Sequence, residues 1–318
     1  MRRIIDLHCD TMMACYFSKA HLDNHDGHIN TEKLLRGGCL SQAFALFLPT
    51  DGKKTRDRRE PWDLYKDMLE CWNEEIDANS KYIRRAYTAD DIDDNDKNGY
   101  MSALLTVEDG IGIDGKASRV QEMYKDGVRM LALTWNFENC IGFPNSADPE
   151  LHRRGLKPFG KETVEQMNEL GMIIDVSHLS EGGFYDVAEI SQVPFIASHS
   201  CARALRDHPR NLTDDQLKTL ADHGGVVGMN FCSDFLSEDS EHTHAEDIVK
   251  HMVHIRNVAG IESMAWGSDF DGIEPNLDFK DYAGFPTLLD LMSKEFTASE
   301  MDKINHENFM RVMKDAGL

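Results

Sequence analysis

Short apolar runs recur along the whole chain and alternate with longer amphipathic stretches. Runs that are apolar at nearly every position are typical of parallel strands buried on both faces of a sheet. Eight such runs occur, at residues 4–9, 42–48, 103–107, 128–135, 172–176, 195–198, 226–231 and 264–268. The sequence therefore predicts a largely parallel sheet.

The stretches between these runs carry helix signals. Pro61 begins one helix, since proline is favoured at the first helical position. Thr213 and Gln216 form a capping box that begins another, which Gly224 ends. The polar stretch 89–99 is expected to be a solvated loop. Further helices are expected at residues 120–127, 164–171, 248–255, 286–296 and 299–316.

The alternation of strands and helices indicates the fold class. Eight strands separated by helices predict an α/β fold, a (β/α)8 TIM barrel. A doubly wound sheet shares the same alternation and is the alternative at this point. No low-complexity linker divides the chain, so we expect residues 1–318 to form a single barrel domain with C-terminal helices.

Charge and cysteine content narrow the partners and the compartment. Lys and Arg number 34 against 56 Asp and Glu, a net charge of −22, so we expect no nucleic acid and no membrane as partner. The seven cysteines include no CxxC pair, which is typical of a reducing compartment. The start, MRRIIDLHCD, has no apolar signal segment, and no apolar stretch is long enough to span a membrane. We therefore expect a cytoplasmic protein.

Histidine and acidic side chains gather where the predicted strands end, which is where barrels of this class carry their active sites. His8 and Asp10 are two residues apart and share one face of the first strand. His178 and His199 directly follow two later runs. Each residue alone is more typical of a helix cap or a hydrogen-bonded core histidine. Together, imidazole and carboxylate groups favour a site for divalent metal.

Further acidic residues extend this pattern. Glu108 ends the third strand, where a carboxylate could bridge two metal ions, cap a helix or act as a general base. Asp269 follows the last strand and could bind a metal or manage the proton of a metal-bound water. Asp6 could orient a ligand, whereas Asp109 and Asp271 are expected to belong to turns.

The motifs at these strand ends resemble those of a known family. DLHCDT, TVEDG, LTWN, DVSHLS, ASHS followed by HPRN, and GSDFDG occur in this order over residues 6–272. They resemble the membrane (renal) dipeptidase family of metallopeptidases, peptidase family M19. The resemblance implies an amidohydrolase-type barrel with two Zn²⁺ per chain, bridged by a glutamate and a water or hydroxide. His8, Asp10 and Glu108 would hold one ion and His178 and His199 the other, with Glu108 as the bridge.

The resemblance also implies an activity. The expected reaction is hydrolysis of the peptide bond of dipeptides, with a C-terminal D-residue as one option, by attack of a metal-bound hydroxide. Glu108 and Asp269 would be the catalytic residues, and Asp269 the general acid and base. Arg210 in HPRN would receive the C-terminal carboxylate of the substrate. The family further suggests a homodimer.

The fourth strand departs from the pattern of the mammalian members. They carry a histidine where this chain has Trp135, although the LTWN form resembles bacterial relatives. An indole ring cannot exchange protons, so we expect Trp135 to fill space beside the substrate and to make the pocket size-selective. The membrane-anchoring signals of the mammalian members are missing from this sequence.

Two other functions stay open at this point. Deaminases, lactonases and phosphotriesterases of the amidohydrolase type usually show HxH on the first strand and often a carboxylated lysine. The HxD spacing of His8 and Asp10, together with Glu108, argues against them. A non-catalytic metal-binding barrel is the third possibility, and the presence of Asp269 and Arg210 argues against it.

Overall fold

Eight parallel strands form the wall of a barrel, in the order β6-β5-β4-β2-β1-β9-β8-β7. This computed structural model describes residues 3–55 and 58–318. Backbone hydrogen bonds close the ring between β6 and β7, from Val176 N to Ile196 O at 2.8 Å and from Ile196 N to Ile174 O at 2.9 Å. The predicted (β/α)8 barrel is therefore confirmed. Its strands are β1 (Ile4–Asp6), β2 (Cys39–Phe47), β4 (Met101–Glu108), β5 (Val128–Ala132), β6 (Ile173–Asp175), β7 (Ala197–Ser200), β8 (Val227–Met229) and β9 (Met264–Trp266).

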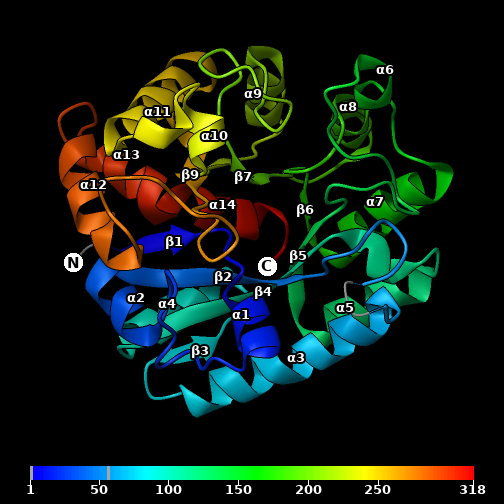
Figure 1. Cartoon of the computed structure of the whole chain (residues 1–318), viewed down its shortest axis with the longest axis horizontal. Helices are drawn as coiled ribbons and strands as arrows, with labels where there is room; N and C mark the ends of the chain where they lie inside the picture. The colour runs from blue at the N-terminus through cyan, green and yellow to red at the C-terminus, as the bar shows by residue number, and fades with distance from the viewer. Residues whose placement is uncertain (1–2, 56–57) are drawn as a thin grey trace.

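Helices surround this ring of strands (Figure 1). The predicted capping box of Thr213 and Gln216 is present at the start of the ninth helix. The α-helices are α1 (Thr11–Ser18), α2 (Thr31–Gly37), α3 (Pro61–Ala78), α4 (Ala89–Lys97), α5 (Ala117–Asp126), α6 (Pro149–His152), α7 (Pro158–Leu170), α8 (Glu181–Ile190), α9 (Asp214–Asp222), α10 (Ser233–Leu236), α11 (Ala245–Ala259), α12 (Phe285–Met292), α13 (Ala298–Asp302) and α14 (Asn308–Asp315). Short helical turns are η1 (Gly110–Ile113), η2 (Ser240–His242), η3 (Ile261–Ser263), η4 (Tyr282–Gly284) and the π-helical η5 (Lys303–Glu307).

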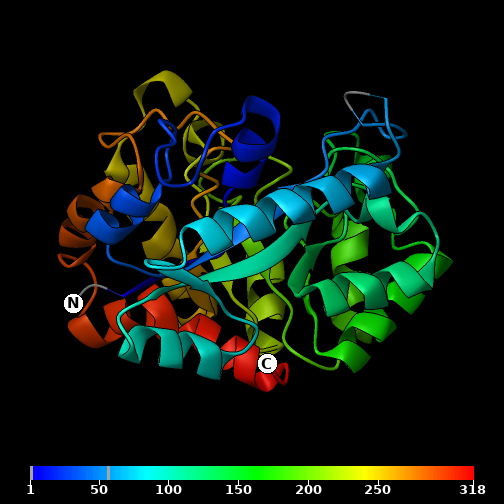
Figure 2. The same cartoon turned by 90° about the horizontal axis from the view of Figure 1, so that it is seen from below.

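Apolar side chains close one end of the barrel. Ile5, Leu104 and Ile173, from three different strands, belong to one buried cluster with Phe309 and Met313 of α14. Figure 2 shows α4 and α14 at this end, away from α1. The carboxyl ends of the strands lie at the other end, where polar side chains can gather.

The segment 89–99 is a helix, so the prediction of a loop is wrong. Thr88 and Asp91 cap α4 reciprocally, with Asp91 N donating to Thr88 Oγ1 at 3.1 Å and Thr88 N donating to Asp91 Oδ2 at 3.0 Å. Ile92 is fully buried and anchors the helix to the barrel. Two of the acidic residues that suggested a loop, Asp90 and Asp91, lie in the first turn and stabilise it, because they face the positive end of the helix dipole.

Two further features were not predicted. A short strand, β3 (Ile83–Arg85), pairs with Met101–Ala103 at the start of β4, while β5 pairs with the later residues of that strand. The predicted C-terminal helix is interrupted by the π-helical η5, where Asn305 Oδ1 accepts a hydrogen bond from Trp266 Nε1 at 3.0 Å. Within the described ranges, no helix is both long and apolar enough to cross a membrane.

Candidate metal centre

The five predicted metal ligands converge at the carboxyl ends of four strands. His8 and Asp10 follow β1, Glu108 ends β4, His178 follows β6, and His199 lies in β7. All five side chains are buried, and the rings of His8 and His199 stack with their centroids 3.9 Å apart. The fold thus brings the five predicted ligands together in one cluster, as a shared metal centre requires.

Glu108 divides its two oxygens between two groups of ligands. Oε2 lies 3.5 Å from His8 Nε2, while Oε1 lies 3.0 Å from His178 Nε2 and 3.7 Å from His199 Nε2. Its backbone is held on both sides, by pairing with Phe47 of β2 and with β5. A carboxylate placed in this way can give one oxygen to each of two ions.

The hydrogen bonds of His199 fix the position of its ring proton. Ser198 Oγ donates to Asp175 Oδ2. The hydroxyl has a single proton, so it must accept from His199 Nδ1, which lies 2.7 Å away. When the ring is neutral, its Nε2 therefore carries a lone pair, which points into the cluster.

His178 carries its proton on the same nitrogen. Its Nδ1 lies 3.2 Å from the amide oxygen of Asn136, which accepts a hydrogen bond. Burial lowers the pKa of both His178 and His199 well below the usual value, so both rings are neutral. Their two Nε2 atoms lie 3.0 Å apart, next to Glu108 Oε1. Two ring nitrogens without a proton thus face each other beside a carboxyl group, which is an arrangement that a cation satisfies.

A second set of acceptors surrounds His8. Its Nε2 lies 3.7 Å from Asp10 Oδ2, 3.5 Å from Glu108 Oε2 and 3.8 Å from Asp269 Oδ1. Among the described residues, His8 Nε2 and Asp10 Oδ1 are buried without a hydrogen-bond partner. Ligand atoms about 2.1 Å from a tetrahedral zinc ion are about 3.4 Å apart, so these separations fit a shared ion. Both His8–Glu108–His199 and His8–Asp10–Asp269 keep their ligand atoms within 4.8 Å of one another.

The electrostatics of the cluster also favour a cation. Burial raises the pKa of Glu108 to about 8, and the Asp10 charge adds to this shift. Burial likewise raises the pKa of Asp269 to about 6, although the nearby His8 opposes it. For His8, burial would lower the pKa, but the charges of Glu108 and Asp10 raise it well above its usual value. Bound divalent metal would neutralise this excess of negative charge.

Asp269 lies at the edge of the cluster on a strained turn. Its φ is 62°, in the left-handed region that is unfavourable for a residue with a Cβ. Asn230 Nδ2 donates to Asp269 Oδ2 at 2.9 Å, so Oδ1 is left facing His8. A Cβ at Gly272 would lie 2.0 Å from Asp10 Oδ2 and 2.7 Å from Asp269 Oδ1, so only glycine fits there. The position suits either a proton carrier or a metal ligand.

Arg210 is buried beneath the histidines rather than exposed on a loop. Its Nη1 donates to the carbonyl of Ser177, and its Nη2 donates to the carbonyl of His199 at 3.0 Å. These bonds hold the backbone next to both candidate histidine ligands. Arg210 Nε is buried and lacks a partner among the residues described. The Nε–Nη2 edge of the guanidinium therefore keeps hydrogens that it does not donate to any described residue.

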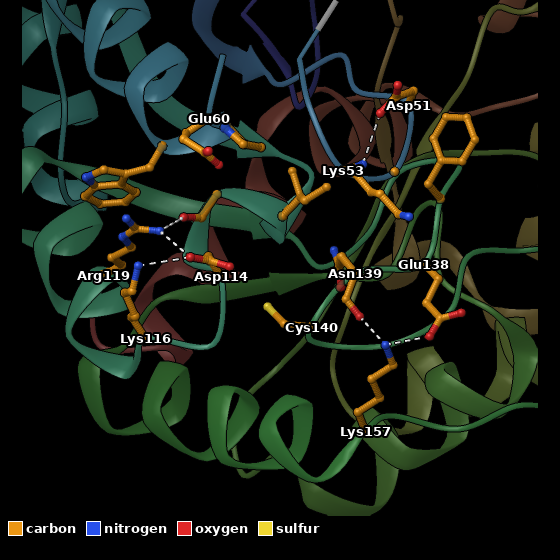
Figure 3. Close-up of a pocket in the computed structure, with 16 residues that line it drawn as sticks. Asp51, Lys53, Glu60, Asp114, Lys116, Arg119, Glu138, Asn139, Cys140 and Lys157 are labelled. Atoms are coloured by element: carbon orange, nitrogen blue, oxygen red, sulfur yellow. Dashed lines mark hydrogen bonds and ion pairs between the residues drawn. The ribbon is translucent and has the colours of Figure 1, made fainter. Parts of the chain in front are cut away.

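Trp135 lines a hollow beside the cluster. Its ring is half-buried, with its centroid 4.8 Å from that of Phe47. The hollow measures about 810 Å³ and is bounded on the other side by Met13 and Phe17 of α1. A second hollow of about 910 Å³ lies between the loops after β2, β4 and β5 (Figure 3). Its described lining includes none of the eight predicted site residues.

The sequence analysis did not identify four residues that orient the site. Asp175 and Ser198 orient His199, Asn136 orients His178, and Asn230 orients Asp269. Serine and asparagine are too common at strand ends to stand out by type. Their position next to a predicted ligand, as in Ser198 before His199, was the usable signal.

The remaining acidic residues hold neighbouring segments of the chain in place. Asp6 accepts hydrogen bonds from Ser268 N at 2.8 Å and Ser268 Oγ at 2.6 Å, so it joins β1 to the loop after β9. Asp109 accepts from Ile111 N at 3.0 Å and begins η1. Asp271, in the left-handed region at φ 65°, accepts from Thr11 Oγ1 at 2.6 Å.

Three comparisons with known proteins point in one direction. Residues 2–318 match the family described as "Membrane dipeptidase (Peptidase family M19)". An uncharacterised protein from the pqqA 5′ region of Klebsiella pneumoniae is 35% identical, over 80% of this chain and 97% of that protein. An uncharacterised dipeptidase of Schizosaccharomyces pombe is 30% identical, over 99% of this chain and 81% of that protein. A metallopeptidase of Rhodobacter sphaeroides, solved with a phosphinate mimic of the dipeptide L-Ala-D-Ala, is 25% identical, with a TM-score of 0.90 over 99% of each chain.

Proposed function

Because this chain belongs to the membrane dipeptidase family, peptidase family M19, and is a metallo-dipeptidase of that family, we propose that it works with two zinc ions. In this proposal His8, Asp10 and Glu108 hold one ion and His178 and His199 hold the other. The observation that carries the proposal is the division of Glu108, whose Oε2 faces His8 and whose Oε1 faces His178 and His199. Imidazole and carboxylate donors are the ligands that zinc takes in hydrolytic sites.

The chain's own residues then have distinct roles in hydrolysis. When bound, divalent ions supply the positive charge that polarises a carbonyl and makes a water molecule acidic. Asp269 accepts a proton from that water at Oδ1 and returns it to the leaving amine. Asn230 holds the other oxygen of Asp269 in place, at 2.9 Å. The turn at Asp269, with its positive φ, keeps this carboxylate next to His8.

Arg210 supplies the proposed recognition of the substrate. Its free Nε and the remaining Nη2 hydrogen form an edge that matches the two oxygens of a C-terminal carboxylate. A carboxylate held so close to the ligands restricts hydrolysis to very short peptides. The Rhodobacter sphaeroides structure contains a mimic of L-Ala-D-Ala, which supports dipeptides as substrates and a C-terminal D-residue as an accepted option.

No observation favours a different hydrolase or a binding protein. Four structures described as amidohydrolases or as 2-pyrone-4,6-dicarboxylic acid hydrolases reach TM-scores of 0.52–0.57 at 9–13% identity, which reflects the shared fold alone. The decisive experiment is a dipeptide-library assay on the zinc-reconstituted protein, with metal analysis of the same sample. Turnover with about two zinc ions per chain supports the proposal, while turnover of esters or lactones without dipeptide hydrolysis would overturn it.

Two further proposals concern the protein in the cell. We propose a cytoplasmic location, which is supported by the seven cysteines, all of them free and all within the described ranges. A homodimer is proposed from the family resemblance alone, and size-exclusion chromatography with light scattering tests it.

A further inference from the structure

A mainly apolar groove opens beside the candidate metal centre. Its apolar lining comes from Met13 and Phe17 of α1, from Phe47 and Pro49, and from Trp135, and Asp51 is its one acidic lining residue among those described. Its volume of about 810 Å³ lies within the range of small-molecule sites. Phe17 is 41% exposed, although burying an aromatic ring away from water is favourable in free energy.

The groove is tied to the candidate ligands at three points. Met13 N donates to the carbonyl of Asp10 at 2.8 Å. Phe47 pairs in register with Glu108 on the neighbouring strand. On the third side, Trp135 directly precedes Asn136, whose amide oxygen accepts from His178 Nδ1 at 3.2 Å. The groove therefore lies next to the candidate metal centre.

The order of the strands sets the direction of a bound dipeptide. Around the ring, β1 and β2 lie opposite β6 and β7. Arg210 bonds to Ser177 and His199 on the β6–β7 side, whereas Met13 and Phe47 belong to the β1–β2 side. A dipeptide whose C-terminal carboxylate lies at Arg210 and whose scissile carbonyl lies at the metal centre must extend its N-terminal residue toward the groove.

We propose that the groove binds the side chain of the N-terminal residue of the substrate and selects for large apolar side chains there. This inference rests on the proposed dipeptidase function and names its substrate class. The aromatic rings that line the groove can contact a large apolar side chain and exclude water from its surface. A glycine or alanine at this position would leave Phe17 and Trp135 uncovered.

The other hollow near the site is a poorer candidate for this side chain. Figure 3 shows that its wall is rich in charged groups that are already paired. Lys116 Nζ lies 3.0 Å from Asp114, and Lys157 Nζ lies 2.7 Å from Glu138. An apolar side chain would have to desolvate these ion pairs, at a cost that the groove at Trp135 does not impose.

The test measures kcat/KM on zinc-loaded protein for two matched series of dipeptides. One series varies the N-terminal residue, as in Gly-Gly, Ala-Gly, Leu-Gly and Phe-Gly, and the other varies the C-terminal residue, as in Gly-Leu and Gly-Phe. For the wild type we expect Phe-Gly and Leu-Gly to exceed Gly-Gly by about tenfold or more, since pocket contacts of this size discriminate by about 10–200-fold. Phe17→Ala and Trp135→Ala should reduce that ratio several-fold and leave the C-terminal series unchanged.

Matched variants keep the outcomes distinct. Phe17 is partly exposed, so Phe17→Ala should fold as the wild type does even if Trp135→Ala is less stable. Tyr82→Ala removes an aromatic ring of similar exposure outside the groove and should change neither series. Equal ratios in wild type and Phe17→Ala, or an effect confined to the C-terminal series, would overturn the groove proposal alone. Absence of hydrolysis of every dipeptide would overturn the proposed function and this inference together.

Discussion

The Nε2 atoms of His178 and His199 lie 3.0 Å apart, although the partners of both rings place the proton on Nδ1. Two lone pairs at this distance repel each other unless a cation lies between or beside them. Glu108 Oε1 lies 3.0 Å from His178 Nε2 and can serve as a third ligand once a cation has displaced the proton of this carboxyl group. The arrangement therefore favours a cation site in this half of the cluster.

The bridge is tested by Glu108→Gln. The amide keeps the size of the side chain but replaces one of the two anionic oxygens by an NH₂ group, which repels a cation. We expect weaker binding of at least one ion and loss of activity, measured by elemental analysis after dialysis against a weak chelator. Glu274→Gln, at a fully exposed side chain, is the control. Full occupancy and near-normal turnover in Glu108→Gln would remove Glu108 from the bridge.

The proton carrier is tested by Asp269→Asn. The amide can still accept a hydrogen bond from Asn230, but it cannot take up a proton. We expect both ions to be retained and kcat to fall by about 10²-fold or more, because general acid–base catalysis contributes about 10²–10⁴-fold. Because the side chain also lies 3.8 Å from His8 Nε2, metal content must be measured on the same sample. If an ion is lost, Asp269 is a ligand and its assignment as proton carrier is wrong.

The sequence predicts the barrel well because its strands are buried on both faces. Runs such as 103–107 and 264–268 are apolar at most positions and fully buried, and a parallel sheet is the fold that buries them. The short helix α2 was missed because its main signals are single capping residues, Asn30 and Gly38. The helix at 89–99 was misjudged because an acid-rich composition resembles a loop, although Thr88 and Asp91 formed a readable capping box.

The candidate site divides in a similar way. Histidine and acidic residues at strand ends carry their chemistry in their type, so His8, Glu108 and His199 were found. Roles that depend on the direction in which a side chain points could not be predicted from the sequence. The bonds of Arg210 to two carbonyls, and the bond of Ser198 to Asp175, depend on how loops far apart in sequence meet. Such contacts are set by tertiary packing, which leaves no periodic pattern in the sequence.

The orientation of His199 is tested by Ser198→Ala and Asp175→Asn. Removing the hydroxyl leaves His199 Nδ1 without its acceptor, so the ring can turn or change its tautomer. We expect each variant to weaken zinc binding by about 10–100-fold, measured by competition with a chromophoric chelator. Because both residues act through one chain of bonds, the double variant should be little worse than either single one. Additive losses would mean that Ser198 and Asp175 act separately.

Arg210 is tested first on the wild-type protein. Dipeptides and their C-terminal amides differ only in the group that Arg210 is proposed to hold, so the amides should be poor substrates. Equal kcat/KM for the two classes would reject this role. In Arg210→Ala the preference should shrink, and the protein should lose about 1–3 kcal/mol of stability, because the carbonyl of Ser177 loses its donor and that of His199 keeps only Asn230 Nδ2, at 3.5 Å. Urea unfolding separates this structural loss from the change in preference.

His251 provides a test of acid stability away from the metal centre. The ring is buried in α11, where Nδ1 accepts from Ala202 N at 3.1 Å and Nε2 donates to Leu236 O at 3.1 Å. The bond from Ala202 N requires a neutral ring, because a protonated Nδ1 cannot accept, and burial lowers the pKa of His251 to about 4. In the unfolded chain the pKa is about 6.5. This contribution to stability is therefore complete above about pH 6.5 and is lost as the pH falls toward 4, because only the unfolded state then takes up the proton.

The expected loss is on the order of 3 kcal/mol in the free energy of unfolding between pH 7 and pH 4, since each pKa unit is worth about 1.36 kcal/mol. His251→Gln keeps a donor and an acceptor but does not titrate, so its stability should fall less steeply over this range in urea unfolding. Contributions from the metal centre are common to both proteins and cancel in the difference. His242→Gln, at an exposed ring, should follow the wild type. Parallel pH profiles for wild type and His251→Gln would show that the folded protein accommodates a charged His251.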